Sequence, residues 1–300
     1  MTVGLPSPRP LPQASDIKLI ISDVDGTLLD SHHRLPTSNP TCQILQRLRR
    51  THPNLPIIIS TGKQHRSTAE LRELLDLYPF PCCHVNGNVL YTADGTIISE
   101  TALRWETVRK AYKSVAAHHA TFFLYDHSIV YQVSSGLDDT AGDRWATALR
   151  GYGEDVRRST IDELEAAGTT IIKVAICQEE AELATTRAAL AKQEVEGGYA
   201  IVQALTFCAE LIPRAYNKGT ALVSLLKYMK TELGQDIDVK NVIAFGDGEN
   251  DISMFGVAGM SVAMGNAMQK AKDVAVWETV TNDEGGVGRF LEEVFFPVPN

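Results

Sequence analysis

Short apolar runs alternate with amphipathic stretches over residues 16–90 of the chain. The apolar runs lie at about 18–23, 56–60 and 82–86, and each ends in polar or turn-forming residues. Between them, leucine and isoleucine recur at helical spacing over about 41–50 and 67–77. Continuous apolar runs are typical of strands buried on both faces, and amphipathic connections are typical of the helices that cover them. This part of the chain therefore predicts a parallel, doubly wound α/β sheet.

The same alternation returns in the C-terminal part of the chain. Asn217 is a predicted N-cap for a helix that runs to about Leu233 and has a leucine-rich face. Strands are then predicted at about 241–245 and 260–263, a helix from about 250, and a last helix at the glycine turn 285–288. We expect these elements to complete the core that the first part begins.

The middle of the chain follows a different pattern. Val89–Tyr91 and Thr96–Ile98 flank an Asp94-Gly95 turn, which predicts a β-hairpin. Further strands are predicted at about 122–125, 129–132, 170–176, 200–203 and 207–211, and helices at about 107–119, 139–150 and 179–192. Antiparallel pairs mixed with helices predict an inserted α+β domain. The expected organisation is a disordered leader at 1–15, a core at 16–90 and 206–300, and a cap domain at 91–205.

Composition narrows the possible functions. With 300 residues and 44% hydrophobic content, the chain is long enough for two domains with buried cores. A net charge of −9 argues against nucleic acid or an anionic membrane surface as the main partner, and no apolar stretch reaches membrane-spanning length. The five cysteines show no CxxC or zinc-like spacing, which favours free thiols in a reducing compartment and a cytoplasmic protein. The proline-rich leader has no signal-peptide core.

Two carboxylates stand directly after the first predicted strand, in the segment Asp23-Val24-Asp25-Gly26-Thr27. Ligands of open α/β sheets bind outside the carboxyl ends of the strands, so both side chains can face one crevice if the chain turns at Gly26. One carboxylate can then attack a phosphorus atom while the other transfers a proton. Taken alone, the segment is also compatible with a solvated acidic turn.

Three later segments favour the catalytic interpretation, because each stands at a predicted strand end or helix start. They are Ser60-Thr61-Gly62-Lys63, Asn217-Lys218-Gly219-Thr220 and Gly246-Asp247-Gly248-Glu249-Asn250-Asp251. With the first segment, they resemble in order the four signature motifs of the haloacid dehalogenase (HAD) superfamily of phosphohydrolases. The Cof-type subfamily is most similar, since it also has Asn-Gly after the third strand (here Asn86-Gly87) and a stretch like Val262–Ala267. The resemblance covers about 17–90 and 207–295.

The resemblance implies a role for each acidic motif residue. Asp23 matches the nucleophile, which forms an aspartyl-phosphate and is also a metal ligand. Asp25 matches the general acid and base, with its backbone carbonyl on the metal. Asp247 matches a direct metal ligand, and Asp251 matches an aspartate that supports the metal shell. Because the carboxylates and the phosphate repel one another, a cation must bridge them, and Mg²⁺ suits such a site.

Other motif residues are expected to hold the phosphoryl group. Lys218 opens a helix, where a lysine normally opposes the helix dipole, so we expect an anion in front of it. The Thr61 hydroxyl and the Gly62 amide are expected to donate to a phosphoryl oxygen, with Ser60 as the alternative hydroxyl. Two further contacts to phosphate or substrate are expected, from Asn250 and Asn86.

Some chemically suggestive residues fall outside this scheme. Lys63 stands where the subfamily usually has arginine; it keeps the charge but loses the two-pronged hydrogen bonding of a guanidinium. His65 and His84 have no partner at metal-ligand spacing and are expected to be structural, as is Tyr125 among the aromatic residues of the cap.

The expected function is that of a Mg²⁺-dependent phosphatase acting on a small phosphorylated metabolite, such as a sugar phosphate, a nucleotide or a cofactor phosphate. The insertion between Gly62 and Lys218 resembles the second cap class of the family, and it is expected to close over the crevice and select the substrate. That class also contains phosphomannomutases, which these motifs do not distinguish from phosphatases. A non-catalytic regulator of the same fold is expected to lose motif residues, and all are present.

Overall fold

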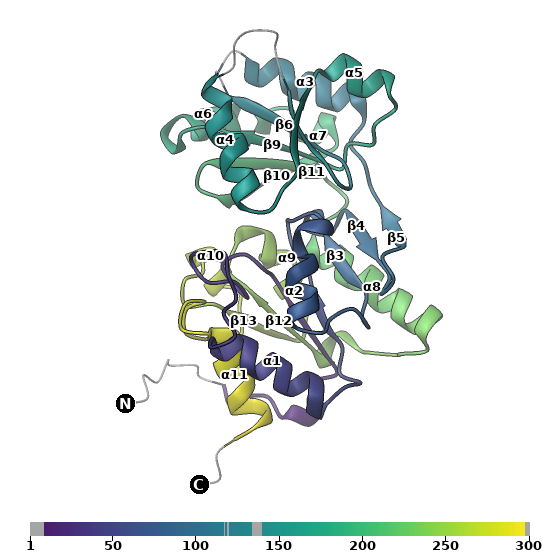
Figure 1. Ribbon diagram of the computed structural model, residues 1–300, viewed down its shortest axis with the longest axis vertical. Coiled ribbons are helices and arrows are strands. Elements are labelled where there is room, and N and C mark those ends of the chain that lie inside the picture. Colours follow the sequence, from purple (N-terminus) through teal and green to yellow (C-terminus); the bar gives the residue numbers. More distant parts are fainter. Residues whose placement is uncertain (1–8, 117, 119, 134–139, 298–300) are drawn as a thin grey trace.

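The computed structural model describes residues 9–116, 118, 120–133 and 140–297. Two bodies of α/β structure lie one above the other in Figure 1, and the chain passes from the lower to the upper body and back. Most of the expected leader, the start of the helix expected at 139 and the end of the helix expected at 119 lie outside the described residues. Among the helices that are described, none combines the length and the apolar character needed to span a membrane.

The lower body is built on a five-stranded sheet with the strand order β14-β13-β12-β1-β2. Its members are β1 (Leu19–Ser22), β2 (Ile57–Ile59), β12 (Val242–Gly246), β13 (Met260–Ala263) and β14 (Trp277–Glu278), and all neighbours are parallel. The N-terminal and C-terminal segments of this body meet at the centre of the sheet, where Leu19 pairs with Val242 and Ser22 with Phe245. This register places the residues that follow β1 and β12 side by side.

Helices cover both faces of this sheet, because both alternating sets of strand side chains are apolar. Ile20 and Ile243 share a buried cluster with α1 and α11 on one face, whereas Leu19 and Ile21 share one with α8 and α9 on the other. The helices are α1 (Pro40–Thr51), α2 (Ala69–Leu74), α8 (Lys218–Leu233), α9 (Ile252–Phe255), α10 (Gln269–Lys272) and α11 (Gly286–Phe295). The predicted doubly wound α/β fold is confirmed (Figure 1).

Two helices of this body are shorter than the sequence predicts. The helix expected at 67–77 consists of a 3-10 turn, η2 (Arg66–Thr68), followed by α2, and the helix expected from 250 begins as η5 (Glu249–Asp251) before α9. Two further 3-10 turns are η1 (Ala14–Asp16) and η4 (Val239–Asn241).

The third predicted strand is not a full member of the parallel sheet. β3 (Cys82–His84) is joined to it by a single parallel bridge between Ser60 and Cys83. It pairs instead with the predicted hairpin, formed by β4 (Val89–Tyr91) and β5 (Ile97–Glu100), in a three-stranded antiparallel sheet. β3 ends at the turn η3 (Val85–Gly87), where Val85 and Asn86 have φ of 51° and 56° and the chain reverses into β4.

The upper body is a six-stranded sheet with the order β10-β11-β9-β6-β7-β8. Its strands are β6 (Thr121–Tyr125), β7 (Val130–Val133), β8 (Val156–Ser159), β9 (Lys173–Cys177), β10 (Tyr199–Leu205) and β11 (Cys208–Pro213), and its helices are α3 (Trp105–Ala116), α4 (Thr140–Gly151), α5 (Ile161–Ala166), α6 (Glu180–Ala191) and α7 (Glu194–Gly197). Phe122 and Leu124 pack under α3, α5 and α6, whereas Phe123 and Tyr125 face α4 and the lower body. Sequence patterns missed β8, α5 and α7, which are short and rich in charge.

Candidate active site

Two aspartates meet where β1 and β12 end. Asp23 follows β1, and its amide donates to the carbonyl of Phe245 in β12 at 3.0 Å. Asp247 follows β12 and accepts a hydrogen bond from the Thr27 hydroxyl at 3.1 Å. Between them the chain turns at Gly26, whose φ is 71° and where a Cβ atom would lie 2.3 Å from Asp247 Oδ2. A side chain at this turn would therefore strain the backbone and displace the Asp247 carboxylate.

Lys218 reaches the same place from the first turn of α8. Asn217 caps this helix, since its side chain accepts from the amide of Thr220 at 2.9 Å. The Lys218 side chain is 0% exposed, and its Nζ donates to Asp23 Oδ1 at 2.6 Å and to Asp251 Oδ1 at 2.7 Å. The Lys218 ammonium is thus held between two aspartates. The Gly219 and Thr220 amides bond to Ser253 and Asn217, so an anion bound jointly by the helix start and the ammonium stays a prediction.

Asp251 is buried and fixes the loop that follows β12. Its Oδ2 accepts from the amides of Asp247 and Gly248, both at 2.9 Å. One carboxylate oxygen from each of Asp23, Asp247 and Asp251 lies within 4.8 Å of the other two. The Asp25 carboxylate is not part of this group; its expected metal contact is through the backbone carbonyl and stays a prediction.

The three carboxylates carry more negative charge than Lys218 balances. Burial raises the pKa of Asp23 in spite of Lys218, and the charges of Asp251 and Asp247 raise it further. Burial, followed by the charge of Asp251, raises the pKa of Asp247 to about 7. Such shifts are typical of an anionic site without its counter-charge. A divalent cation held by oxygen ligands supplies that charge, so these residues fit a Mg²⁺ ion.

Asp25 has a different environment, although it is two residues from Asp23. Its Oδ1 lies 3.3 Å from Lys63 Nζ and 3.4 Å from His33 Nδ1. Burial alone would raise the pKa of Asp25, but the hydrogen bond with His33 and the charge of Lys63 lower it. The two aspartates of the first motif therefore lie in different electrostatic environments, with the pKa of Asp23 raised and the pKa of Asp25 lowered. His33 was expected to be a solvated or structural histidine, so its contact with Asp25 is a finding of the structure.

The segment after β2 lies beside these aspartates. Thr61 is fully buried, and its hydroxyl accepts from the Lys63 amide at 3.1 Å, whereas the Ser60 hydroxyl is engaged with Cys83 Sγ at 3.4 Å. Gly62 reaches the wall of the pocket described below. A phosphate contact from the Thr61 hydroxyl and the Gly62 amide stays a prediction that this arrangement allows.

Asn86 connects the motifs rather than lining the pocket. Its Oδ1 accepts from Asn250 Nδ2 at 2.9 Å, and its Nδ2 donates to the Glu210 carboxylate of β11. Asn86 is 1% exposed, whereas Asn250 lies at the pocket surface. The direct substrate contact expected from Asn86 therefore stays untested, and the structure gives it a bridging position between the two bodies.

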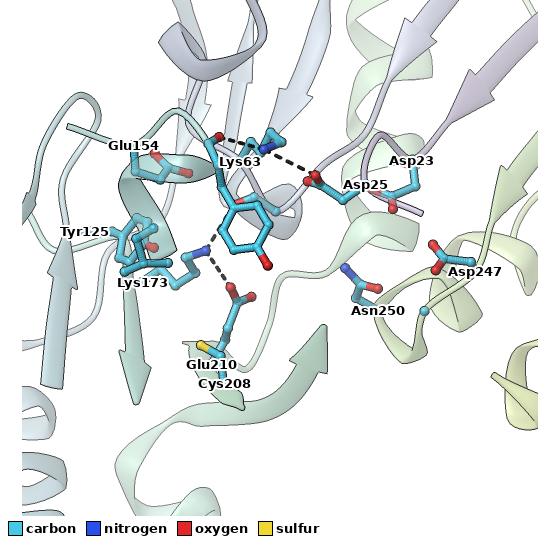
Figure 2. Close-up of a pocket in the computed structure, with 14 residues that line it drawn as sticks. Asp23, Asp25, Lys63, Tyr125, Glu154, Lys173, Cys208, Glu210, Asp247 and Asn250 are labelled. Atoms are coloured by element: carbon cyan, nitrogen blue, oxygen red, sulfur yellow. Dashed lines mark hydrogen bonds and ion pairs between the residues drawn. The ribbon is translucent and has the colours of Figure 1, made fainter. Parts of the chain in front are cut away.

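A cavity of about 90 Å³ opens in front of Asp23, Asp25 and Asp247 (Figure 2). Its opposite wall comes from the six-stranded sheet, the end of α4 and the loop that follows α4. The residues are Tyr125, Leu149, Tyr152, Glu154, Lys173, Cys208 and Glu210. Lys173 and Glu210 form a buried ion pair at 2.6 Å, and Lys173 Nζ also donates to the Gly62 carbonyl at 3.0 Å. Burial alone would lower the pKa of Lys173, but Glu210 raises it.

The sequence patterns did not predict this wall of the pocket. A signal for it existed, because Lys173 and Glu210 are charged residues inside apolar strand sequences, Ile171–Cys177 and Cys208–Pro213. A charged side chain in a buried strand needs a partner, so each predicts a polar site nearby. Tyr125 was expected in the core, and it is both buried and part of the pocket wall.

A doubly wound core, an aspartate–lysine cluster at its strand ends and a second sheet over that cluster define the class of capped α/β phosphohydrolases. Comparison with known proteins identifies the family: residues 20–291 match the haloacid dehalogenase-like hydrolase family, and the chain belongs to it. The chain is a phosphoric monoester hydrolase of the Cof-type branch of that family.

Individual relatives cover nearly the whole chain. An uncharacterized hydrolase of Schizosaccharomyces pombe is 38% identical, over 95% of this chain and 93% of its own. The Bacillus subtilis 5-amino-6-(5-phospho-D-ribitylamino)uracil phosphatase YitU is 27% identical, over 92% and 97%. A haloacid dehalogenase-like hydrolase from Bacteroides thetaiotaomicron, known as a crystal structure, has a TM-score of 0.75 at 26% identity and covers 93% of this chain and 100% of its own.

Proposed function

We propose that this phosphatase hydrolyses a small phosphomonoester through an aspartyl-phosphate on Asp23 and depends on Mg²⁺. The observation that supports this most directly is the divided environment of the first motif. Asp23 is buried against Lys218 and two further carboxylates, whereas Asp25 faces Lys63 and His33 at the pocket. The proposed nucleophile and the proposed proton-transfer group are thus two residues apart in the chain but have different charged neighbours.

In the first step, a carboxylate oxygen of Asp23 attacks the phosphorus atom and the bond to the leaving oxygen breaks. Lys218 holds the carboxylate at Oδ1 with a 2.6 Å hydrogen bond, which fixes its direction and costs no reorganisation during the reaction. In the second step, water attacks the phosphoryl group and releases phosphate and the Asp23 carboxylate. Splitting a slow hydrolysis into two easier steps is the benefit of covalent catalysis.

Asp25 carries the proton in both steps. It gives a proton to the leaving oxygen and then takes one from the attacking water. Without substrate, His33 and Lys63 lower the pKa of Asp25, so the carboxylate is ionised at neutral pH. A doubly negative phosphoryl group placed beside Asp25 raises that pKa and competes for Lys63. Asp25 therefore takes up a proton from solvent when the substrate binds, and this is the proton that the first step requires.

Mg²⁺ bound by Asp23 and Asp247, and by the Asp25 carbonyl, would offset the repulsion between the phosphoryl group and the carboxylates. Asp251 would support it by holding the amides of Asp247 and Gly248 and by sharing Lys218. The raised pKa of Asp247, about 7, means that bound metal competes with a proton for this carboxylate.

The cap domain selects the substrate in this proposal. We propose that the cap spans about 102–214 instead of the 91–205 expected from the sequence. The hairpin of β4 and β5 pairs with β3 and so lies outside the cap, whereas β11 belongs to the six-stranded sheet and so lies inside it. Lys63 Nζ donates to the Tyr152 carbonyl at 2.8 Å and Gln64 to the Asp126 carbonyl at 2.7 Å. The cap therefore contacts the loop that follows β2 and contains Gly62, Lys63 and Gln64, called the motif loop below. The leaving group would lie between Tyr125, Tyr152 and the Lys173–Glu210 pair.

Five buried free cysteines support the expectation of a cytoplasmic protein.

A panel of phosphorylated metabolites tests the proposal. It should include sugar phosphates, nucleotides, cofactor phosphates and, because of YitU, 5-amino-6-(5-phospho-D-ribitylamino)uracil. We expect phosphate release that needs added Mg²⁺ and stops in excess chelator. Conversion of a sugar phosphate into its isomer without phosphate release would indicate a mutase, and no turnover of any compound would indicate a regulator. Undiminished turnover after complete metal removal would refute the metal requirement.

A further inference from the structure

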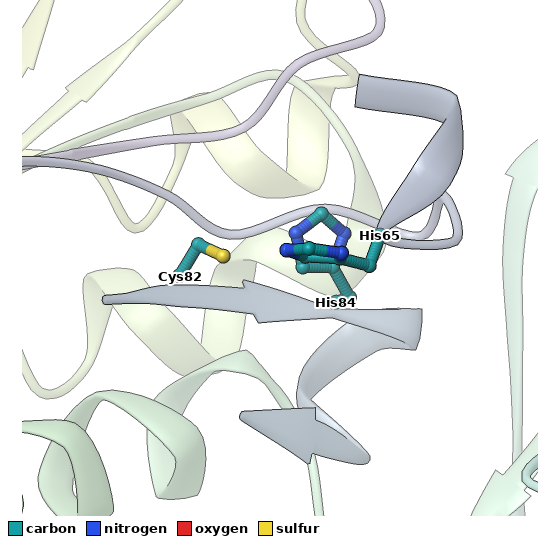
Figure 3. A group of neighbouring side chains, drawn as sticks. All are labelled: His65, Cys82 and His84. Atoms are coloured by element: carbon teal, nitrogen blue, oxygen red, sulfur yellow. The ribbon is translucent and has the colours of Figure 1, made fainter. Parts of the chain in front are cut away.

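A second group of potential metal ligands lies where β3 meets the loop that follows β2. His65, Cys82 and His84 each offer one ligand atom, and these atoms lie within 4.8 Å of one another. Figure 3 shows the Cys82 sulfur directed toward the two imidazole rings. Cys82 and His84 share one face of β3, because side chains two residues apart on a strand point the same way. His65 reaches them from the residue before η2.

Both imidazoles present an unpaired nitrogen. His84 is 0% exposed, and its Nδ1 lies 3.2 Å from the Lys63 carbonyl. Since a carbonyl can only accept, Nδ1 carries the proton and Nε2 carries a lone pair. Nε2 of His84 and Nε2 of His65 are both buried and find no hydrogen-bond partner among the described residues. Buried polar atoms are nearly always satisfied, so two unpaired nitrogens beside one thiol point to a ligand.

The ring geometry matches shared ligation. The His65 and His84 ring centres are 5.1 Å apart, and the ring planes cross at 79°. Two imidazoles bound to one ion through metal–nitrogen bonds of about 2.0–2.1 Å place their ring centres about 5 Å apart. The backbone hydrogen bond at His84 Nδ1 is also the kind of outer contact that orients a ligating histidine.

A buried cation, Arg72, lies beside Cys82 and His65 and favours an anion there. It is 6% exposed, its Nε is buried without a partner, and no carboxylate pairs with it within the described part of the chain. Its guanidinium faces the Cys82 thiol and donates to the His65 carbonyl at 3.2 Å. A thiolate at Cys82 would supply the missing anionic partner, and a metal ion is what makes a buried thiol ionise.

We propose that His65, Cys82 and His84 bind one thiophilic d10 metal ion, with Cu⁺ preferred over Zn²⁺. Imidazole and thiolate suit both ions, whereas the oxygen cluster of Asp23, Asp247 and Asp251 suits Mg²⁺. Two features favour the monovalent ion. Zn²⁺ takes four ligands in structural sites, and three are grouped within the described residues. A Cu⁺ ion bound to the Cys82 thiolate forms a pair without net charge. A Zn²⁺ ion bound to the same thiolate would leave one positive charge buried beside the Arg72 guanidinium, which is unfavourable.

The bound ion would fasten the motif loop. His65 lies in the loop that begins with Gly62 and Lys63, and His84 already holds this loop through the Lys63 carbonyl. A metal bond from His65 to β3 would add a second attachment close to the residues that contact the cap. The site is thus structural, and its occupancy does not depend on turnover.

Metal loading of the full-length protein tests the site. Protein freed of metal under reducing conditions is mixed with Cu⁺ or Zn²⁺ in excess Mg²⁺, separated by gel filtration and analysed for bound metal by mass spectrometry. We expect about one Cu⁺ per chain, held against a competing Cu⁺ chelator, with an X-ray absorption spectrum of two nitrogen ligands and one sulfur ligand. Binding of Zn²⁺ alone, with the same ligands, would support the site and overturn the preference for Cu⁺.

Variants show which side chains hold the ion. Cys82→Ser and His65→Gln should lower retained metal at least tenfold, with folding checked by circular dichroism. Cys83→Ser is the matched control, because the neighbouring Cys83 points to the other face of β3, toward Ser60; it should retain the metal. Failure of the wild-type protein to hold either ion, or undiminished binding in Cys82→Ser, would overturn the proposal.

Discussion

Replacing Asp247 by asparagine should stabilise the protein in the absence of metal, although it destroys a ligand of the proposed Mg²⁺ site. Burial, followed by the charge of Asp251, raises the pKa of Asp247 from 3.8 to about 7, although the Thr27 hydroxyl and Lys218 lower it. A carboxyl whose pKa is higher in the folded than in the unfolded state binds its proton more tightly when folded. Its contribution to stability is therefore complete below about pH 4 and is lost as the pH rises through about 7.

The size of this effect follows from the shift. About three pKa units correspond to roughly 4 kcal/mol at 1.36 kcal/mol per unit. Asp247 is partly exposed, and solvent screens its repulsion from its neighbours, so about 2 kcal/mol is the value we expect. Asparagine keeps the shape and can still accept the hydrogen bond from the Thr27 hydroxyl, but it never carries the charge. Asp247→Asn should thus be more stable than the wild type by about 2 kcal/mol at pH 8 and equal to it near pH 4.

Urea denaturation followed by circular dichroism measures the difference, in chelator and in excess Mg²⁺, between pH 4 and 8. In a thermal scan, 2 kcal/mol corresponds to a rise in Tm of about 4 °C for a chain of this size. Added Mg²⁺ should reverse the order at pH 8, because the wild type gains binding energy that the variant loses. Asp236→Asn, at an exposed ion pair with Lys230, is the control and should stay within about 0.5 kcal/mol at every pH. A variant less stable than the wild type at pH 8 in chelator, or a gap that does not close toward pH 4, would refute the reasoning.

Three further predictions concern catalysis and are checked by steady-state kinetics. Asp23→Asn should keep the fold and lose at least a hundredfold in kcat, because an amide is a poor nucleophile, and a higher residual rate would indicate another nucleophile. His33→Ala removes a hydrogen bond that lowers the pKa of Asp25, so the limb of the kcat/KM profile governed by Asp25 should move to higher pH; a shift to lower pH would contradict the assignment. Tyr152→Ala in the cap wall should change the ratio of kcat/KM between substrates by about tenfold, whereas Lys218→Met should depress all substrates alike; equal losses in both variants would argue against selection by the cap.

Much of the fold and the grouping of the motifs could be predicted, because both depend on local patterns. Apolar runs followed by charged or hydroxyl residues mark strand ends, and parallel strands bring their carboxyl ends to one edge, so Asp23, Asp247 and Lys218 meet where their positions in the sequence imply. The roles of these residues in a reaction stay predictions. The end of β3 could not be foreseen, since it depends on positive φ at Val85, a residue whose type favours extended backbone.

The pocket wall and the second metal site depend on contacts between distant segments. Lys173 and Glu210 meet because β9 and β11 are neighbours in the upper sheet, a pairing that periodicity does not specify. His65 and His84 are 19 positions apart and have no ligand spacing in the sequence. They approach each other because β3 returns alongside the loop after β2, through the bridge from Ser60 to β3. Tertiary pairing, rather than residue type, was the missing information in both cases.

Asp23 should become phosphorylated during turnover. Wild-type protein with Mg²⁺ is mixed with the best substrate of the panel, quenched in acid within one turnover and reduced with borohydride, which converts an aspartyl-phosphate into a stable alcohol. Peptide mass spectrometry then locates the modified residue. We expect modification of Asp23 in the wild type and none at this position in Asp23→Asn. Modification of a different side chain, or product formed within the first turnover while Asp23 stays unmodified, would contradict it.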